Sequence, residues 1–274
     1  MPLAKADADF LRQLVRAKSG IVLGEDKGYL LESRLTPLAK AIGLEGVEDL
    51  VPRLRSEPNG QLARQVVEAM TTNETFFFRD LHPFECLKKV VLPDLIAKRA
   101  ASRRLDFWCA AASTGQEPYS VAIVLREHFP QVSGWTVRFL ATDIATEVLK
   151  RARAGRYSQL EVNRGLPAPL LLKYFTKDGL DWVIKDDLKR MIEFKELNLL
   201  DAYPISGQLD VIFIRNVLIY FDIETKREIL AKCRKLLRPD GYLFLGGAET
   251  TLNIDDNFVR VDYDKGGCYR LRGA

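Results

Sequence analysis

The stretch LDFWCAAASTGQEP, residues 105–118, contains the pattern that decides the fold. Leu105 to Cys109 is a short, mostly apolar run that predicts a buried strand. Small residues and one glycine then lead to Pro118, which suits the first turn of a helix predicted over 117–129. A strand, a tight loop and a helix in this order are typical of an α/β domain with a parallel sheet.

The loop between this strand and helix lacks the features of a phosphate-binding loop. It has one glycine, Gly115, where a dinucleotide fingerprint has three, and no lysine follows that glycine. Glu117 adds a negative charge that would repel a pyrophosphate. A tight strand-to-helix turn explains the loop equally well, so the loop alone does not establish a ligand site.

Alternating strands and helices continue to the end of the chain. Strands are predicted over 137–141, 192–194, 209–214, 242–245, 258–263 and 268–271, and helices over 145–154 and 223–237. This alternation predicts a mostly parallel sheet covered on both faces. We expect a turn at Pro239–Gly241, and an antiparallel edge formed by the last two strands, joined through Lys265–Gly267.

The remaining sequence predicts two further parts and one insertion. Residues 1–70 carry apolar residues at helical spacing, such as Leu11, Leu14 and Val15, and predict an all-α N-terminal domain. Residues 71–103 form a bridge that ends in a linker helix over 84–100, and residues 104–274 form the α/β domain. Asp178-Gly179 lies between two β-prone runs and predicts a hairpin. We therefore expect a small antiparallel β-subdomain inserted at about 155–195.

The composition is that of a globular protein with one or two domains. The 274 residues are 47% hydrophobic and 28% charged, and their net charge of +4 is well short of a dedicated nucleic-acid binder. We expect no secretory signal and no membrane span, because no apolar run approaches roughly 20 residues. The four cysteines form no CxxC pair and predict reduced core residues in a cytoplasmic protein. Two isolated histidines do not suggest a metal site.

Polar residues follow several of the predicted strands, where an open parallel sheet binds its ligands. These residues are Glu117, Asp143, Asn198 and the pair Arg215-Asn216. Asp143 is placed to accept both hydroxyls of a ribose, although it equally suits a helix N-cap, and an asparagine at a strand end is often only a turn residue. Acids after two strands, without a phosphate cradle, favour a ribose-bearing cofactor with positive charge. S-adenosylmethionine fits that description.

Five motifs, in order along nearly the whole chain, resemble those of the chemotaxis receptor methyltransferases, the CheR family. They are TTNETFFFRD at 71–80, WCAAASTGQEPYS at 108–120, ATDI at 141–144, NLL at 198–200 and RNVLIYFD at 215–222. The resemblance implies a Rossmann-like methyltransferase sheet with a small antiparallel β-subdomain inserted, preceded by an all-α helical N-terminal domain.

The resemblance also implies the site. The cofactor would be S-adenosylmethionine, the product S-adenosylhomocysteine, and no metal would take part. Arg79 and Tyr220 would lie beside the transferred methyl group as the catalytic residues, and Asp143 would hold the ribose. The full set implied for the cofactor is Asn73, Thr75, Arg79, Glu117, Asp143, Asn198, Leu199, Arg215 and Asn216.

The implied reaction is methyl transfer to glutamate side chains on the cytoplasmic helices of chemoreceptors, during chemotaxis adaptation. The partners would be these receptor domains, without nucleic acid or direct membrane insertion, and the enzyme would be a cytoplasmic monomer. The hairpin at Asp178-Gly179 is shorter than the loop of family members that dock a receptor pentapeptide, so we expect no such docking. Lys27, Arg34 and Lys40 are candidates for a basic face toward the acidic receptor, although a solvated helix face is the commoner explanation.

Three alternative functions fit the sequence less well. A nucleic-acid amino-methyltransferase usually carries an Asn/Asp-Pro-Pro-Tyr/Phe loop, where this chain reads RNVL at 215–218 with no proline. A nicotinamide oxidoreductase would need the missing glycine triplet. A module that binds the cofactor without turnover is poorly separated by sequence, but Arg79 and Tyr220 favour an enzyme.

Overall fold

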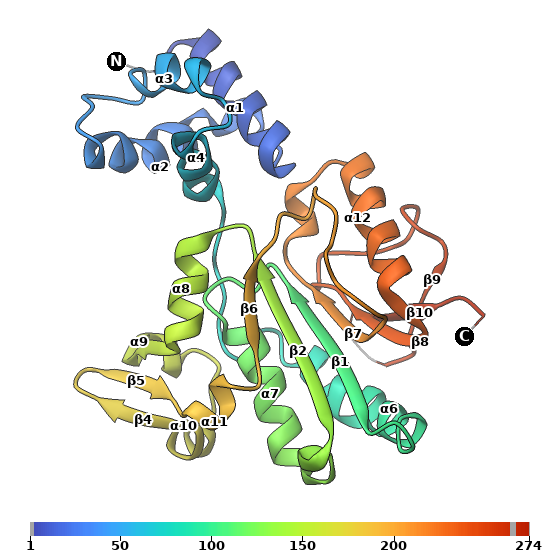
Figure 1. Ribbon diagram of the computed structural model, residues 1–274. Helices are drawn as coiled ribbons and strands as arrows, with labels where there is room; N and C mark the ends of the chain where they lie inside the picture. Colours follow the sequence, from blue (N-terminus) through green and yellow to red (C-terminus); the bar gives the residue numbers. More distant parts are fainter. Residues whose placement is uncertain (1–2, 264–266, 274) are drawn as a thin grey trace. The chain divides into compact units, whose positions relative to one another are not determined.

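Two compact units make up the computed structural model, which describes residues 3–263 and 267–273 (Figure 1). The first, here called the helical unit, contains the chain up to Thr72 together with Asn198–Ala202 and Tyr220–Thr225. The second, the sheet unit, contains Asn73–Leu197, Tyr203–Ile219 and the chain from Lys226 onward. The helical unit is therefore built from three separate stretches of chain, two of which lie inside the range predicted for the α/β domain.

Amphipathic helices form the helical unit, as predicted. They are α1 (Lys5–Ser19), the 3₁₀ turn η1 (Glu25–Lys27), α2 (Gly28–Ala41), α3 (Leu50–Ser56) and α4 (Gln61–Met70). Leu11, Leu31 and Leu54 are fully buried, because the apolar stripes of the helices face one another. The guanidinium of Arg34 donates to the carbonyl oxygens of Met70 and Thr71 at 2.7 and 3.0 Å. Arg34, a candidate for a basic face, thus ties α2 to the end of α4.

Helix α1 ends at a glycine that no other residue replaces easily. Gly20 has φ of +76°, and its N–H donates to the carbonyl oxygen of Arg16 at 2.8 Å. A β-carbon at this position would lie 3.0 Å from Leu200 Cδ2 and 3.2 Å from Phe221 Cδ1. The segments 198–202 and 220–225 therefore pack closely on the end of α1.

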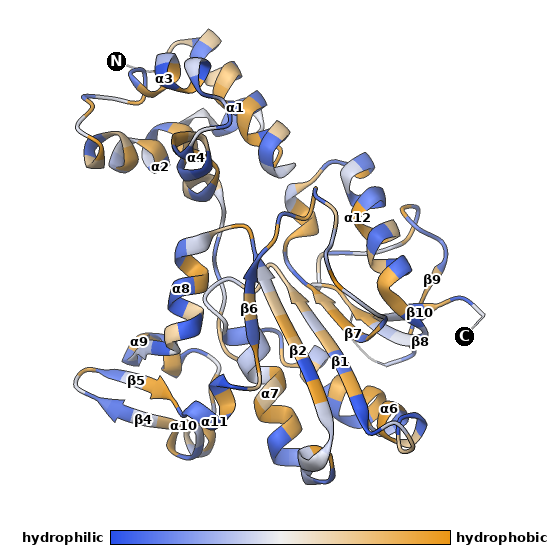
Figure 2. Cartoon of the chain, viewed as in Figure 1, coloured by the Kyte–Doolittle hydropathy of each residue, from blue (hydrophilic) through white to orange (hydrophobic). Residues whose placement is uncertain are grey.

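The sheet unit is organised around a sheet with the strand order β6-β2-β1-β7-β8-β10-β9. The strands are β1 (Arg104–Ala110), β2 (Thr136–Asp143), β6 (Glu193–Glu196), β7 (Leu209–Ile214), β8 (Leu237–Phe244), β9 (Phe258–Arg260) and β10 (Cys268–Leu271). Strands β6, β2, β1, β7 and β8 run parallel, and β10 is antiparallel to β8 and β9. The predicted parallel sheet with an antiparallel edge is confirmed. Figure 2 shows hydrophobic residues along β1 and β7, and every residue of β7 is buried.

Helices precede β1 and follow β1, β2 and β7. They are α5 (His82–Cys86), the π-helical turn η2 (Leu87–Val91), α6 (Leu92–Lys98), α7 (Gln116–His128), the 3₁₀ turns η3 (Pro130–Gly134) and η4 (Leu218–Tyr220), α8 (Thr146–Ala154) and α12 (Ile223–Leu236). Within the described residues, no helix combines the length and the apolar character that crossing a bilayer requires.

The helix predicted over 84–100 is interrupted by the π-helical turn. Pro93 lies just after that turn and has no N–H to donate to the carbonyl of Lys89, four residues earlier. Its ring would also clash with that carbonyl in a regular α-helix. The wider turn accommodates the proline without ending the helix.

A small antiparallel sheet with the order β3-β5-β4 is inserted after α8, as predicted. Its elements are β3 (Arg156–Ser158), α9 (Gln159–Asn163), α10 (Ala168–Tyr174), β4 (Phe175–Asp178), β5 (Asp181–Ile184) and α11 (Asp186–Lys189). Asp178 pairs with Asp181, so the hairpin loop consists of Gly179 and Leu180. Gly179 has φ of +60°, which is typical of the first loop residue in a two-residue hairpin.

The end of the sheet differs from the prediction in one detail. The expected turn at Pro239–Gly241 lies inside β8, where Leu237 pairs with Leu209 but Tyr242 already pairs with Val211. The intervening residues therefore bulge out of the ladder, because Pro239 has no N–H for a ladder bond. The predicted link through Lys265–Gly267 includes two residues, 265 and 266, that lie outside the described residues.

Candidate functional site

The loop after β1 brings its backbone close to Asp143 at the end of β2. Ala111 and Ser113 have φ of +54° and +50°, a left-handed conformation that is uncommon for residues with side chains. The Ser113 N–H donates to Asp143 Oδ2 at 2.8 Å, and the Ala145 N–H donates to Asp143 Oδ1 at 2.9 Å. The N-cap residue of α8 is Ala145, so Asp143 is not that cap. Its carboxylate instead joins two loops at the carboxyl edge of the sheet.

An ionic cluster centred on the buried side chain of Arg215 connects α7 to the end of β7. The Arg215 side chain is 0% exposed; its Nη1 donates to Glu117 Oε2 at 2.6 Å and its Nη2 to Asp80 Oδ2 at 2.8 Å. Arg215 Nε is buried and has no hydrogen-bond partner in the part of the chain that the structure describes. Burial raises the pKa of the Glu117 carboxyl group above its ordinary value, and the Arg215 guanidinium opposes that rise.

The segment 73–80 is anchored on the loop after β1 and on the small sheet. The Ser113 hydroxyl donates to the carbonyl oxygen of Asn73 at 2.8 Å. Phe77 is fully buried and makes edge-on ring contacts with Tyr157 and Phe175, with centroid separations of 5.1 and 5.5 Å. Thr75, between these anchors, is partly buried.

Arg79 ends this segment in a turn of unusual backbone conformation. Phe78, Asp80 and Leu81 have φ of +52°, +68° and +44°, conformations that are often found at functional sites. Arg79 Nη1 donates to the carbonyl oxygen of Glu74 at 2.7 Å, and the Arg79 carbonyl oxygen accepts from Arg215 Nη2 at 3.0 Å. The turn is therefore fixed to the ionic cluster.

The loop after β7 is organised by a residue that the sequence did not reveal, Glu249. Asn216 has φ of +59°, and its N–H donates to Glu249 Oε2 at 2.8 Å. Glu249 Oε1 accepts from the next two amides, those of Val217 at 2.9 Å and Leu218 at 2.7 Å. Hydrogen bonds to a charged group contribute about 1.5–3 kcal/mol each, so this carboxylate holds the loop firmly. Its sequence context, GGAET at 246–250 after a strand, carries no recognised signal.

Three of the predicted site residues belong to the helical unit. Asn198 Nδ2 donates to the carbonyl oxygen of Lys18 at 2.6 Å, and its Oδ1 accepts from the Leu200 N–H at 3.1 Å. Leu199 is buried. The carbonyl oxygen of Tyr220 accepts from the Val22 N–H at 2.9 Å, and the Tyr220 side chain is partly exposed. The other predicted site residues belong to the sheet unit.

The sheet-unit part of the site carries more negative than positive charge. Its carboxylates are those of Asp80, Glu117, Asp143 and Glu249, and its guanidinium groups are those of Arg79 and Arg215. The Ser113 amide, which a phosphate-binding loop would present to its ligand, is donated to Asp143. This arrangement suits a cation and disfavours a pyrophosphate.

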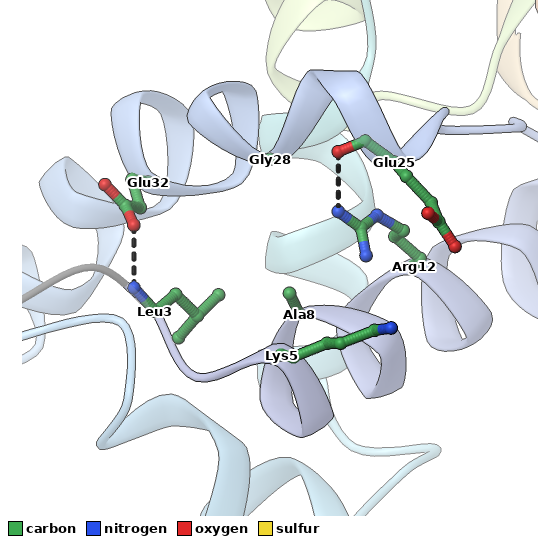
Figure 3. A pocket seen from close by; sticks show the side chains of 7 residues that line it. All are labelled: Leu3, Lys5, Ala8, Arg12, Glu25, Gly28 and Glu32. Carbon is green, nitrogen blue, oxygen red and sulfur yellow. Dashed lines mark hydrogen bonds between the residues drawn. The ribbon is translucent and has the colours of Figure 1, made fainter.

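Two cavities lie elsewhere. One of about 290 Å³ lies in the helical unit, where Lys5, Arg12, Glu25 and Glu32 surround it (Figure 3). Figure 3 shows Arg12 donating to the Glu25 carbonyl oxygen and Glu32 accepting from the Leu3 N–H. Another of about 340 Å³ lies beside the end of α7, with Phe129 and Trp135 in its wall. None of the predicted site residues lines either cavity.

An α/β sheet with acids at its strand ends, joined to an all-α region, is consistent with the class of S-adenosylmethionine-binding methyltransferases. Family comparison supports this class directly. Residues 73–266 match the model described as "CheR methyltransferase, SAM binding domain". Residues 6–71 match the one described as "CheR methyltransferase, all-alpha domain".

Curated relatives agree over almost the full chain. A chemotaxis protein methyltransferase 1 of Pseudomonas aeruginosa is 42% identical over 276 residues, covering 99% of this chain and 100% of that protein. A chemotaxis protein methyltransferase of Pseudomonas putida is 38% identical, again covering 99% and 100%. One of Salmonella typhimurium is 38% identical over 93% of this chain and 88% of that protein. The chain belongs to the CheR methyltransferase family, so it is a methyltransferase with an S-adenosylmethionine-binding domain that acts in chemotaxis.

Proposed function

We propose that this protein transfers the methyl group of S-adenosylmethionine to glutamate side chains on the cytoplasmic helices of chemoreceptors. The products are glutamyl methyl esters and S-adenosylhomocysteine, and the enzyme acts as a monomer in the cytoplasm. The observation that carries the proposal is the hydrogen bond from the Ser113 N–H to Asp143. In a phosphate-binding loop this N–H would donate to a phosphate, whereas here it donates to a carboxylate. The names of the curated relatives support the role in chemotaxis.

The residues of the sheet unit fit the proposed cofactor. A carboxylate offers about four acceptor sites, so the amide bonds to Asp143 are compatible with further bonds from ribose hydroxyls. The buried Arg215 Nε, which lacks a protein partner among the described residues, suits the carboxylate of the methionine end. Glu117 supplies negative charge for a cationic ligand. Asn73, Thr75 and Asn216 are assigned to the same site by resemblance, as are Asn198 and Leu199 of the helical unit.

The chemistry needs positioning more than proton transfer. A glutamate side chain has an ordinary pKa of about 4.3 and is already a nucleophile at neutral pH. S-adenosylmethionine, when bound, supplies a methyl group on a positively charged sulfur; the oxygen–carbon bond forms as the sulfur–carbon bond breaks. Arg79 would hold one oxygen of the substrate carboxylate, and the Tyr220 hydroxyl would orient the reacting group. Alignment of this kind can supply roughly 7–11 kcal/mol.

The hairpin of the small sheet supports substrate recognition without a receptor tail. Its loop consists of Gly179 and Leu180, and Leu180 is 89% exposed. A loop this short offers few backbone groups to pair with an added peptide strand. We therefore expect no heat of binding when a receptor C-terminal pentapeptide is titrated into the protein; measurable binding would refute this part of the proposal.

The decisive experiment is incubation with methyl-labelled S-adenosylmethionine and receptor-containing membranes. Label that mild base releases as methanol identifies a carboxyl ester, whereas base-stable label identifies methylation of an amine. An Arg79→Ala variant should lose most of the transfer, and Arg126→Ala, which removes an exposed arginine of α7, should keep it. Absence of base-labile label with the native protein would overturn the proposed function.

A further inference from the structure

Among the residues that the structure describes, five backbone amides donate hydrogen bonds to the buried carboxylate of Glu249. Oε1 accepts from Val217, Leu218 and Ile219 at 2.9, 2.7 and 3.3 Å. Oε2 accepts from Asn216 at 2.8 Å and from Gly246 at 2.6 Å. Glu249 is 9% exposed, so the amide dipoles, and not solvent, balance its charge.

The chain is built to admit this carboxylate. A β-carbon at Gly246 would lie 2.8 Å from Glu249 Oε2 and 2.9 Å from the backbone nitrogen of Asn216. Both distances are shorter than real β-carbons approach such atoms. Only glycine lets the strand end after β8 come this near to the loop after β7. The glycine and the glutamate thus act as a pair that connects neighbouring strand ends.

We infer that Glu249 is a positioning residue, which locks the turn 216–219 so that Arg215 and Asn216 are held in the orientation that binds the cofactor. This inference rests on the proposed function, because it assumes that these two residues line the cofactor site. Asn216 adopts a left-handed conformation that costs free energy for a residue with a side chain. The bond from its amide to Glu249 stabilises that conformation.

Glu249 also acts on Glu117 through its charge. Three charged groups act electrostatically on Glu117, namely Arg215, Arg79 and Glu249. Arg215 is itself paired with Asp80. The Cys109 thiol is a further titratable neighbour of Glu117. The negative charge of Glu249 raises the pKa of Glu117, and removing it lowers that pKa. A site that needs ionised Glu117 to balance the α-ammonium group, which S-adenosylmethionine and S-adenosylhomocysteine share, would then retain its affinity to lower pH.

The test is calorimetric titration of S-adenosylhomocysteine into native protein, Glu249→Gln and Glu161→Gln, repeated across a range of pH. Glu249→Gln keeps the size of the side chain but places an amide donor against amide donors. For Glu249→Gln we expect the affinity for S-adenosylhomocysteine to fall about tenfold near neutral pH, which is about 1.4 kcal/mol. We also expect the acid limb, which is the decrease of affinity toward low pH, to begin at a lower pH than in the native protein. Glu161 accepts the Ser158 N–H in a helix cap of the same unit, so Glu161→Gln controls for the loss of a structural carboxylate and should shift neither quantity.

Gly246→Ala provides a second variant that retains the charge but displaces the carboxylate. It should weaken S-adenosylhomocysteine binding while leaving the acid limb near that of the native protein. Unchanged affinity and acid limb in both variants, even with reduced thermal stability, would show that Glu249 is only structural and would overturn the inference. Failure of the native protein to bind S-adenosylhomocysteine would instead remove the proposed function, and this inference with it.

Discussion

At the scale of single residues, Asp143 links the loop after β1 to the end of β2. It accepts two loop amides, and we propose that it also holds the ribose. Asp143→Ala should weaken S-adenosylhomocysteine binding by about tenfold or more, because it removes the acceptor of the hydroxyls and loosens the loop at Ser113. Calorimetry on folded protein measures this, and an unchanged dissociation constant would exclude the ribose role.

Glu117 gives the protein a specific pH dependence. Burial raises its pKa in the folded chain, so the folded state binds this proton more tightly than the unfolded state. The contribution of Glu117 to the free energy of unfolding therefore decreases as pH rises from about 4.3 through the folded pKa. Urea denaturation should show that the free energy of unfolding of Glu117→Gln increases relative to that of the native protein as pH rises. Glu147→Gln, at an exposed position of α8, should show no such trend, and a trend of the opposite sign would contradict the assignment.

At the scale of elements, the inserted small sheet supports the segment 73–80. Gly165 has φ of +85°, and a β-carbon there would lie 2.0 Å from the carbonyl oxygen of Phe77. Gly165→Ala should therefore displace that segment, lowering the melting temperature and the affinity for S-adenosylhomocysteine together. Gly179→Ala is the matched control, because Gly179 has φ of +60° but no atom within 4 Å of the added carbon. Equal effects of the two substitutions would mean that backbone strain alone, and not contact with Phe77, determines the loss.

The elements also show which parts of the fold a sequence pattern can predict. Strand β7 was predicted with its observed bounds, because Leu209 to Ile214 is a continuous buried run rich in β-branched residues. Strand β3 was missed, since the three residues Arg156–Ser158 are too few to show a period. The π-helical turn before Pro93 was not predicted either. The sequence shows that Pro93 lacks an N–H, but it does not show whether the helix ends or widens there.

The candidate site, like the fold, is only partly predictable from the sequence. Candidate residues such as Asp143 and Glu117 were found because they follow strands, and strand ends are a general place for ligands. Glu249 was not found, because four of the five amides that it binds lie 30 to 33 residues earlier in the sequence and have no side-chain signature. Their convergence on one carboxylate exists only in three dimensions.

At the scale of the whole molecule, the helical unit should unfold together with the rest of the chain. Phe221 is buried in the helical unit, and the chain continues directly from its segment into α12. Phe221→Ala should lower the free energy of unfolding by about 3–5 kcal/mol. We expect a single calorimetric transition, because α12 begins in the helical unit and continues in the sheet unit. Leu252→Ala, at a position that is 69% exposed, should change little. Two separate transitions, with only the first shifted by Phe221→Ala, would contradict this prediction.

The three-part composition of the helical unit has a consequence for how the protein is made. Its first stretch ends at Thr72, but its last stretch ends at Thr225. At about 5–20 residues per second, the ribosome needs roughly 8 to 30 s to add the intervening chain. Until translation has passed Thr225, the nascent α1 lacks at least one of the two segments that pack on its end at Gly20, so we expect that end to remain accessible to chaperones.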